Sequence, residues 1–131
     1  MIRLEMGADS LVGQVRSANE DSMLVSDGLA VVADGMGGHR GGAVASAEAV
    51  RAVSEAEGSR SLDDLVRTVH LANRRISERA SDDPELRGMG TTVCAVGLVR
   101  RDGADELAIV NVGDSRVYLH SGGELVQLSE D

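Results

Sequence analysis

Short apolar runs in the first third of the chain predict β-strands. They span residues 3–8, 23–26 and 29–33, and only Asp27 and Gly28 separate the second run from the third. An Asp-Gly pair between two β-prone runs is typical of a tight hairpin turn. The next segment, residues 34–42, is too rich in glycine for a helix and too flexible to continue a strand, so we expect a loop there.

The middle of the chain carries a helical pattern. Residues 43–57 are rich in alanine and glutamate, which favour helix, and Gly58 is placed to end this helix as a C-terminal cap. Ser61, followed three residues later by Asp64, resembles a capping box and predicts a second helix that extends to about Ala80. The apolar positions of this helix recur at helical spacing and indicate the face that packs on the core: Leu65, Val69, Ala72 and Ile76.

The pattern after Gly90 is again that of strands joined by short polar turns. We expect these strands over residues 91–99, 106–112, 116–120 and 124–128. Strands joined by short turns are antiparallel, and two consecutive helices can cover only one face of such a sheet. The pattern therefore predicts an α+β fold. No internal repeat or low-complexity linker divides the 131 residues, so we expect one domain or part of one.

Composition and charge exclude several classes of function. The chain has one aromatic residue, Tyr118, which removes base-stacking platforms and aromatic cages. Its formal net charge is −9, and such a field repels nucleic acid and anionic membranes. All 13 basic residues are arginine, so the lysine needed for a Walker phosphate loop or for Schiff-base chemistry is missing. We therefore expect neither nucleic acid nor a membrane as a partner.

The cysteine content and the apolar runs bear on the cellular compartment. Cys94 is the single cysteine, so neither an internal disulfide nor a CxxC metal site can form, which fits a reducing compartment. The first residues do not have the basic and apolar pattern of a signal peptide, and no apolar run approaches membrane-spanning length. The sequence therefore predicts a soluble, cytoplasmic protein.

Acidic residues near the ends of predicted strands are the strongest candidates for chemistry. Asp34 and Asp114 each follow a buried apolar strand, and a further acidic pair, Glu20-Asp21, precedes another strand. If these strands are neighbours, the carboxylates converge at one rim of the sheet. An oxygen-only site of this kind suits Mg²⁺ or Mn²⁺. Zinc is less favoured, because the three histidines lack paired spacing.

Each of these motifs also has a structural interpretation. An Asp-Gly pair is usually a turn, the acidic pair can be solvated or can cap an element, and residues 113–116 can form a tight hairpin. The glycine-rich segment also resembles a dinucleotide-binding loop. However, Arg40 stands where the third glycine of that fingerprint belongs, and no βαβ unit surrounds it. Taken singly, the motifs do not decide the function.

Four motifs follow one another along the chain. They are Arg16-Ser17-Ala18-Asn19-Glu20-Asp21, Val32-Ala33-Asp34-Gly35-Met36-Gly37-Gly38-His39, Gly88-Met89-Gly90-Thr91-Thr92 and Val112-Gly113-Asp114-Ser115-Arg116. In this order and spacing they resemble the metal-dependent protein phosphatase family of type 2C, most closely its bacterial members that reverse Ser/Thr kinases. The resemblance implies a layered α-β-β-α sandwich of antiparallel sheets, of which residues 1–131 are the N-terminal part of a single domain.

The resemblance also implies roles for the matching acidic residues. Asp34 would bridge two metal ions, and the backbone carbonyl of Gly35 would ligate one of them. Glu20 and Asp21 would hold waters bound to the metal, and Asp114 would help to hold a third, weaker ion. The implied cofactors are two or three Mn²⁺ or Mg²⁺ ions. The implied substrates are proteins carrying phosphoserine or phosphothreonine, Ser/Thr kinases among them.

Two further residues would take part in catalysis. Arg16 would bind the substrate phosphate, which suits a planar guanidinium donor. His39 matches a position where bacterial members often carry histidine, and it is either the general acid or an ordinary loop residue. Met36 stands where many eukaryotic members have histidine. Residues 41–43, Gly-Gly-Ala, replace the common Ala-Gly-Glu of bacterial relatives.

Family members continue beyond the last of these motifs and carry further metal-binding aspartates there. We therefore expect only half of the ligand set in this chain and negligible activity from it alone. We also expect self-association through unpaired strand edges. Two alternatives remain open: a catalytically incomplete fragment or paralogue that acts by binding, and a phosphatase of a regulatory partner in sigma-factor switching.

Overall fold

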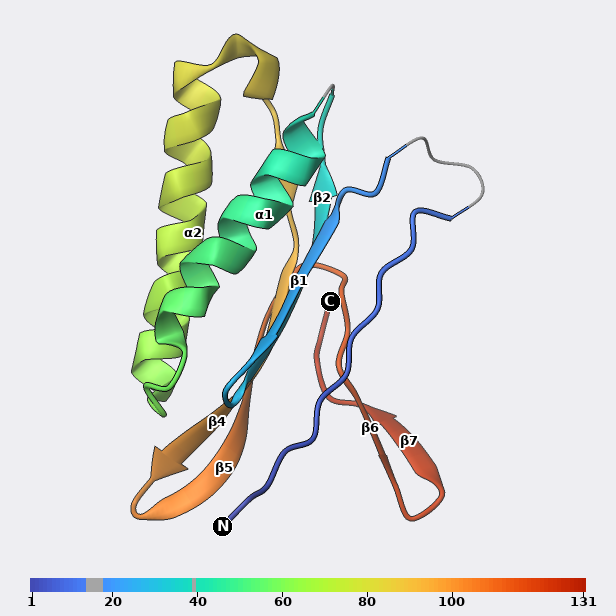
Figure 1. Cartoon of the computed structure of the whole chain (residues 1–131), viewed down its shortest axis with the longest axis vertical. Coiled ribbons are helices and arrows are strands. Elements are labelled where there is room, and N and C mark those ends of the chain that lie inside the picture. The colour runs from blue at the N-terminus through green and yellow to red at the C-terminus, as the bar shows by residue number, and fades with distance from the viewer. Residues whose placement is uncertain (14–17, 39) are drawn as a thin grey trace.

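An antiparallel sheet is the central element of the computed structural model, which describes residues 1–13, 18–38 and 40–131 (Figure 1). The strands of this sheet are β1 (Asp21–Ser26), β2 (Leu29–Met36), β3 (Gly90–Thr91), β4 (Val93–Arg101) and β5 (Ala104–Val112). They are arranged in the order β1-β2-β4-β5, and the short β3 pairs with the end of β2. Every pair is antiparallel, which confirms the predicted α+β class.

The hairpin of β1 and β2 turns at Asp27 and Gly28, as the sequence predicts. Gly28 has a φ of 68°, a left-handed conformation that glycine adopts without steric cost. The register of the hairpin places Asp21 directly opposite Asp34. The turn therefore determines which acidic residues face each other at the far end of the two strands.

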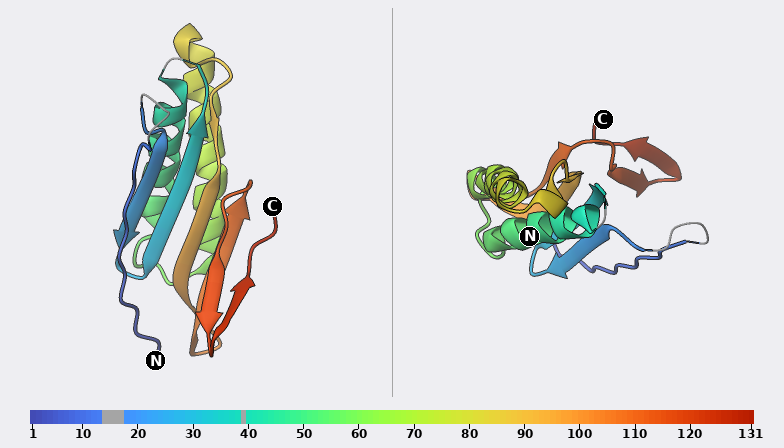
Figure 2. Two further views of the ribbon diagram at one scale, coloured as in Figure 1. Left: turned by 90° about the vertical axis from the view of Figure 1, so that its right-hand side faces the viewer. Right: turned by 90° about the horizontal axis from the view of Figure 1, so that it is seen from above.

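Helices cover one face of the sheet (Figures 1 and 2). In the described residues these are α1 (Gly41–Val53) and α2 (Leu62–Asp82), with short 3₁₀ turns η1 (Ser54–Ala56) and η2 (Pro84–Leu86) after them. Helix α2 begins as predicted, because the Ser61 hydroxyl accepts a hydrogen bond from the Asp64 N–H at 3.2 Å. No helix in this part of the chain is long and apolar enough to cross a bilayer.

The core lies between the sheet and the helices. Leu29, Val31 and Ala33 alternate along β2 and are buried against the helices, whereas Val32 is 47% exposed on the opposite face. Helix α1 places mainly alanines in this layer, so its backbone approaches β2 closely. The predicted core face of α2 is confirmed: Leu65 and Ala72 are buried, and Val69 and Ile76 pack against the same core.

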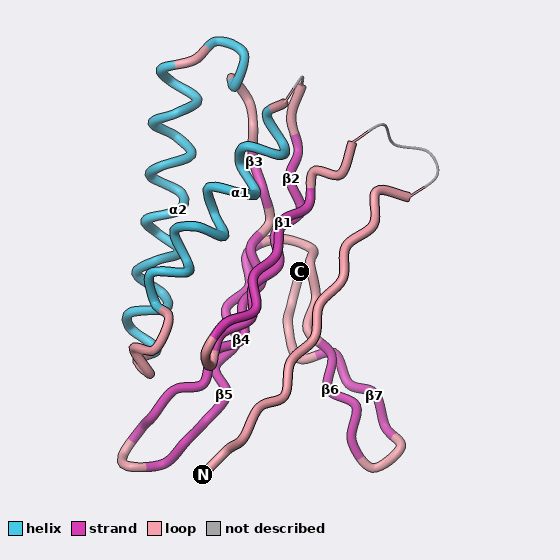
Figure 3. The backbone as a smooth tube through the Cα atoms, in the orientation of Figure 1, coloured by secondary structure: helices cyan, strands magenta, loops and turns pink. Residues whose placement is uncertain are grey.

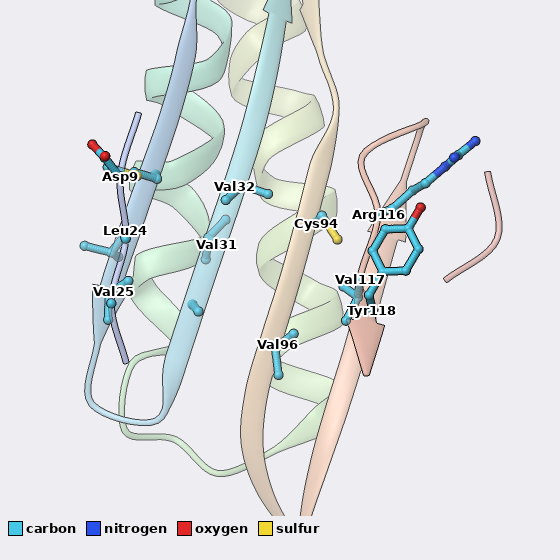
Figure 4. A pocket seen from close by; sticks show the side chains of 14 residues that line it. Asp9, Leu24, Val25, Val31, Val32, Cys94, Val96, Arg116, Val117 and Tyr118 are labelled. Carbon is cyan, nitrogen blue, oxygen red and sulfur yellow. The ribbon is translucent and has the colours of Figure 1, made fainter. Parts of the chain in front are cut away.

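The opposite face of the sheet is partly covered by a second hairpin. Its strands are β6 (Tyr118–Ser121) and β7 (Glu124–Gln127), and it lies beside the sheet on the side away from the helices (Figures 2 and 3). A hollow of about 440 Å³ separates the two, with Val32 and Val96 on the sheet side and Tyr118 on the other (Figure 4). In the described chain, the layers are therefore helices, main sheet and hairpin.

The prediction of a strand over residues 3–8 is wrong. Among the described residues no strand precedes β1. All residues of this segment except Leu4 are exposed, so no buried face fixes it against a neighbouring strand. Its neighbour Ile2 is attached to the sheet through a hydrogen bond from its N–H to the Asp105 carboxylate at 2.9 Å.

Several predicted boundaries also differ from the structure. The loop expected over residues 34–42 is shorter, because β2 continues to Met36 by pairing with β3 and α1 already begins at Gly41. The first helix ends at Val53 and passes into the 3₁₀ turn η1. The strand predicted over residues 91–99 is interrupted at Thr92.

Candidate metal site at the strand ends

Two carboxylates face each other at the edge of the main sheet. Asp21 of β1 and Asp34 of β2 are cross-strand partners, and both are exposed. Like charges directly opposite on neighbouring strands are unfavourable unless something compensates them. Both residues, together with Asp9 and Ser115, line a cleft of about 210 Å³. Carboxylate oxygens from two neighbouring strands therefore meet at one cleft.

Glu20 lies where the end of β2 meets the first turn of α1. Its backbone carbonyl accepts a hydrogen bond from the Gly35 N–H at 3.1 Å. Its carboxylate lies against Gly42, so closely that a Cβ on Gly42 would be 2.8 Å from Glu20 Oε1. The N-terminus of a helix favours negative charge, which suits a carboxylate at this place. The structure thus brings the Glu20 and Gly35 backbones together at the end of β2.

Ser46 supports this arrangement and was missed by the sequence analysis. It is fully buried in α1, and its hydroxyl donates to the Glu20 carbonyl at 2.6 Å. The Ser22 hydroxyl lies 2.8 Å from the Ser46 hydroxyl. A serine in an alanine-rich helix gives no signal of such a role, because Ser22 and the Glu20 carbonyl lie more than twenty residues away in the sequence.

The turn that carries Asp114 reaches the same end of the sheet. Its neighbour Ser115 has its hydroxyl 2.6 Å from the hydroxyl of Thr92, and Thr92 Oγ1 in turn accepts a hydrogen bond from the Asp34 N–H at 2.9 Å. Gly113 has a φ of 105° and lies against the Thr92 side chain. Asp114 itself is exposed. Three of the four motifs therefore meet through hydrogen bonds around Asp34.

The carboxylates of the described chain form at most part of a ligand set. Across residues 1–13, 18–38 and 40–131, no group of three or more His, Cys, Asp or Glu side chains is placed to hold a metal ion. The Asp21–Asp34 pair offers only oxygen donors, which suit Mg²⁺ or Mn²⁺. Arg16 and His39 lie outside the described residues.

Comparisons with known proteins agree with the motifs. The family model for protein phosphatase 2C matches residues 14–131. Serine/threonine protein phosphatase PstP of Mycobacterium tuberculosis is 37% identical over 132 residues, which cover 98% of this chain and 25% of PstP. Serine/threonine phosphatase stp of Listeria monocytogenes is 39% identical, with 91% of this chain and 51% of stp covered. The chain thus spans a quarter to a half of the length of these curated relatives.

Solved structures show the same fold. The crystal structure of PstP from Mycobacterium tuberculosis superposes with a TM-score of 0.82 at 38% identity, over 91% of this chain and 51% of that one. The PstP catalytic domain in complex with two manganese ions gives a TM-score of 0.82 at 37% identity, over 91% and 52%. Stp1 from Staphylococcus aureus gives 0.77 at 29% identity, over 91% and 50%.

Proposed function

The chain belongs to the protein phosphatase 2C family, and on this basis we propose that residues 1–131 are the N-terminal part of a single phosphatase domain that hydrolyses phosphoserine and phosphothreonine in proteins. The observation that carries the proposal is the Asp21–Asp34 pair, which lines a cleft at the strand ends. The proposed substrates include phosphorylated Ser/Thr kinases. The proposed cofactors are two or three Mn²⁺ or Mg²⁺ ions.

The acidic residues have distinct proposed tasks. Asp34 would hold two ions through its carboxylate, and the Gly35 carbonyl would be a ligand of one of them. Glu20 and Asp21 would hold waters bound to the metal, and Asp114 would help to hold a third, weaker ion. Ions held by these residues would supply an activated water and charge stabilisation for phosphoryl transfer. The support for this assignment is the chemistry of the donors, because every candidate ligand is an oxygen atom.

Arg16 and His39 complete the proposed machinery. Arg16 binds the phosphoryl oxygens through its guanidinium, which positions the substrate. His39 would donate a proton as a general acid to the leaving oxygen, which departs as the serine or threonine hydroxyl. The support for both assignments is their place in the first and second motifs.

A chimera tests the proposal. Residues 1–131 would replace the matching half of the PstP catalytic domain, and hydrolysis of a phosphothreonine peptide would be followed in Mn²⁺, in Mg²⁺ and in excess chelator. We expect turnover with either metal and none in chelator. Arg16→Ala should mainly raise KM, because its contacts are shared by ground and transition states. His39→Ala should lower kcat by about 100-fold. Full activity in chelator would contradict the proposal.

The alternative is a catalytically incomplete fragment or paralogue that acts only by binding. The same chimera separates the two candidates. A folded chimera that binds Mn²⁺ and phosphopeptide but has no turnover would favour the binding module.

A further inference from the structure

The regular ladder between β2 and β4 is broken opposite Asp34. The register on either side, Val32 with Cys94 and Gly35 with Thr91, places Asp34 opposite Thr92. One half of the expected backbone pair is present, since the Thr92 N–H donates to the Asp34 carbonyl at 3.0 Å. In the other half, the Asp34 N–H donates to Thr92 Oγ1 at 2.9 Å instead of to the Thr92 carbonyl. A side-chain hydroxyl thus replaces a backbone acceptor at this residue.

The displaced carbonyl of Thr92 has another partner. It accepts a hydrogen bond from the Thr91 hydroxyl at 2.8 Å. Both backbone groups and the side chain of Thr92 are therefore satisfied although the ladder is broken, as buried polar groups require. The break is a stable feature of the fold.

The same hydroxyl reaches a second segment. Thr92 is 6% exposed, and its Oγ1 lies 2.6 Å from the Ser115 hydroxyl. Gly113 packs on the Thr92 side chain so closely that a Cβ there would lie 2.8 Å from Thr92 Cγ2. In a regular ladder the Asp34 N–H would donate to the Thr92 carbonyl, and the Thr92 hydroxyl would have no contact with Asp34. One hydroxyl therefore joins the backbone of Asp34 to the turn that contains Asp114.

We propose that Thr92 is a positioning residue whose hydroxyl fixes the segments of Asp34 and Asp114 relative to each other, and that cation binding at the strand ends depends on this link. The inference rests on the proposed function, because it assigns a task to the metal-binding residues named there. Removal of the hydroxyl leaves the Asp34 N–H without its acceptor and Ser115 without its partner. The Thr92 N–H still donates to the Asp34 carbonyl, but the segment of Asp114 loses its hydroxyl link to Asp34.

The experiment uses the chimera that carries residues 1–131 and compares the unmodified chain with three variants. Thr92→Val keeps the shape and removes the hydroxyl, and Thr92→Ser keeps the hydroxyl. Thr68→Val is the matched control, because Thr68 is 7% exposed and its hydroxyl donates to the Leu65 carbonyl at 2.7 Å within α2. Two quantities are measured: amide hydrogen exchange at Asp34 by ¹⁵N NMR, and Mn²⁺ affinity by electron paramagnetic resonance of the free ion.

We expect Thr92→Val to speed exchange of the Asp34 amide at least tenfold and to weaken Mn²⁺ binding by about five- to tenfold, the effect of one lost hydrogen bond. Thr92→Ser and Thr68→Val should match the unmodified chain in both measurements. If Thr92→Val lowers the melting temperature but leaves Asp34 exchange and the Mn²⁺ dissociation constant unchanged, Thr92 has only a structural role and the inference is overturned.

Ser115→Ala provides a second, milder test that keeps the Asp34 hydrogen bond and removes only the link to the turn. It should weaken Mn²⁺ binding severalfold with little change in Asp34 exchange, and an unchanged affinity would overturn the inference. Failure of the proposed function has a different signature. In that case the unmodified chain itself binds no Mn²⁺, and the exchange measurement still decides whether the Thr92 hydroxyl holds Asp34.

Discussion

Gly35 and Gly42 lie where the end of β2 meets the first turn of α1. Replacing each of them by alanine should change the stability of the fold in opposite directions. A Cβ on Gly35 would lie 1.9 Å from the Gly42 carbonyl oxygen and 2.8 Å from the Glu20 carbonyl oxygen, so backbone would have to move. A Cβ on Gly42 would instead meet the Glu20 carboxylate at 2.7–3.0 Å. That group is the end of a flexible side chain and can move aside.

The magnitudes follow from these contacts. Gly35→Ala should cost about 3 kcal/mol of unfolding free energy, the upper end for overpacking, because the obstacle is backbone. In a domain of this size that lowers the melting temperature by roughly 10 °C. Gly42→Ala removes the entropic cost of a glycine inside a helix, so it should leave the unfolding free energy unchanged or raise it by about 0.5–1 kcal/mol. Its cost falls on Glu20, whose carboxylate must leave the N-terminus of α1.

Thermal unfolding followed by circular dichroism, together with Mn²⁺ titration, checks both variants. Gly38→Ala is the control, since nothing lies within 4 Å of a Cβ at that position. We expect Gly35→Ala to be destabilised, and Gly42→Ala to be stable but to bind Mn²⁺ more weakly than Gly38→Ala. A Gly35→Ala variant as stable as Gly38→Ala would refute the close approach of β2 and α1.

Three further predictions concern other parts of the molecule. Glu48→Gln should cost about 1–2 kcal/mol of unfolding free energy in urea denaturation, because the buried carboxylate pairs with Arg79 at 3.1 Å. Glu55 forms an exposed ion pair with Arg75, so Glu55→Gln should change the unfolding free energy by no more than about 0.5 kcal/mol. Equal losses for the two variants would contradict this prediction. Burial raises the pKa of the Cys94 thiol, so native protein should react with a thiol reagent at pH 8 far more slowly than unfolded protein, and equal rates would show an accessible thiolate. A hydrogen bond from Arg116 holds the pKa of the Asp131 carboxyl below its usual range. The small stabilising effect of this contact is therefore present above about pH 4 and is lost as the pH falls through the folded-state pKa. Asp131→Asn should weaken the dependence of the melting temperature on pH between about pH 3 and pH 5, and an unchanged dependence would argue against the contact.

Local signals account for the parts of the fold that the sequence predicts correctly. The turn at Asp27 and Gly28 and the cap at Ser61 depend on residues within a few positions of each other. The extension of β2 to Met36 depends on pairing with β3, more than fifty residues away, and no local pattern reports it. The segment 3–8 has a strand-like pattern but no partner, so its pattern alone was misleading.

The residues of the candidate site also fall into two groups, those that the sequence indicates and those that only the structure shows. Asp34 and Asp114 could be singled out because each follows an apolar run in the sequence, and the structure brings their segments to one end of the sheet. Ser46 and Thr92 could not, because a buried hydroxyl is recognised only through partners that the fold supplies. Residue type and position therefore indicate candidate ligands, whereas the hydrogen bonds that hold them require the structure.

The central claim is that Asp34 binds the cations of a metal-dependent phosphatase. Its most direct test is kcat for a phosphothreonine peptide in saturating Mn²⁺, measured for the chimera with Asp34→Asn and for a control with Asp102→Asn at an exposed turn. Loss of a bridging charge disrupts both ions, so Asp34→Asn should lower kcat by about a thousandfold or more while the control remains fully active. Near-normal turnover of the Asp34→Asn chimera would contradict the account.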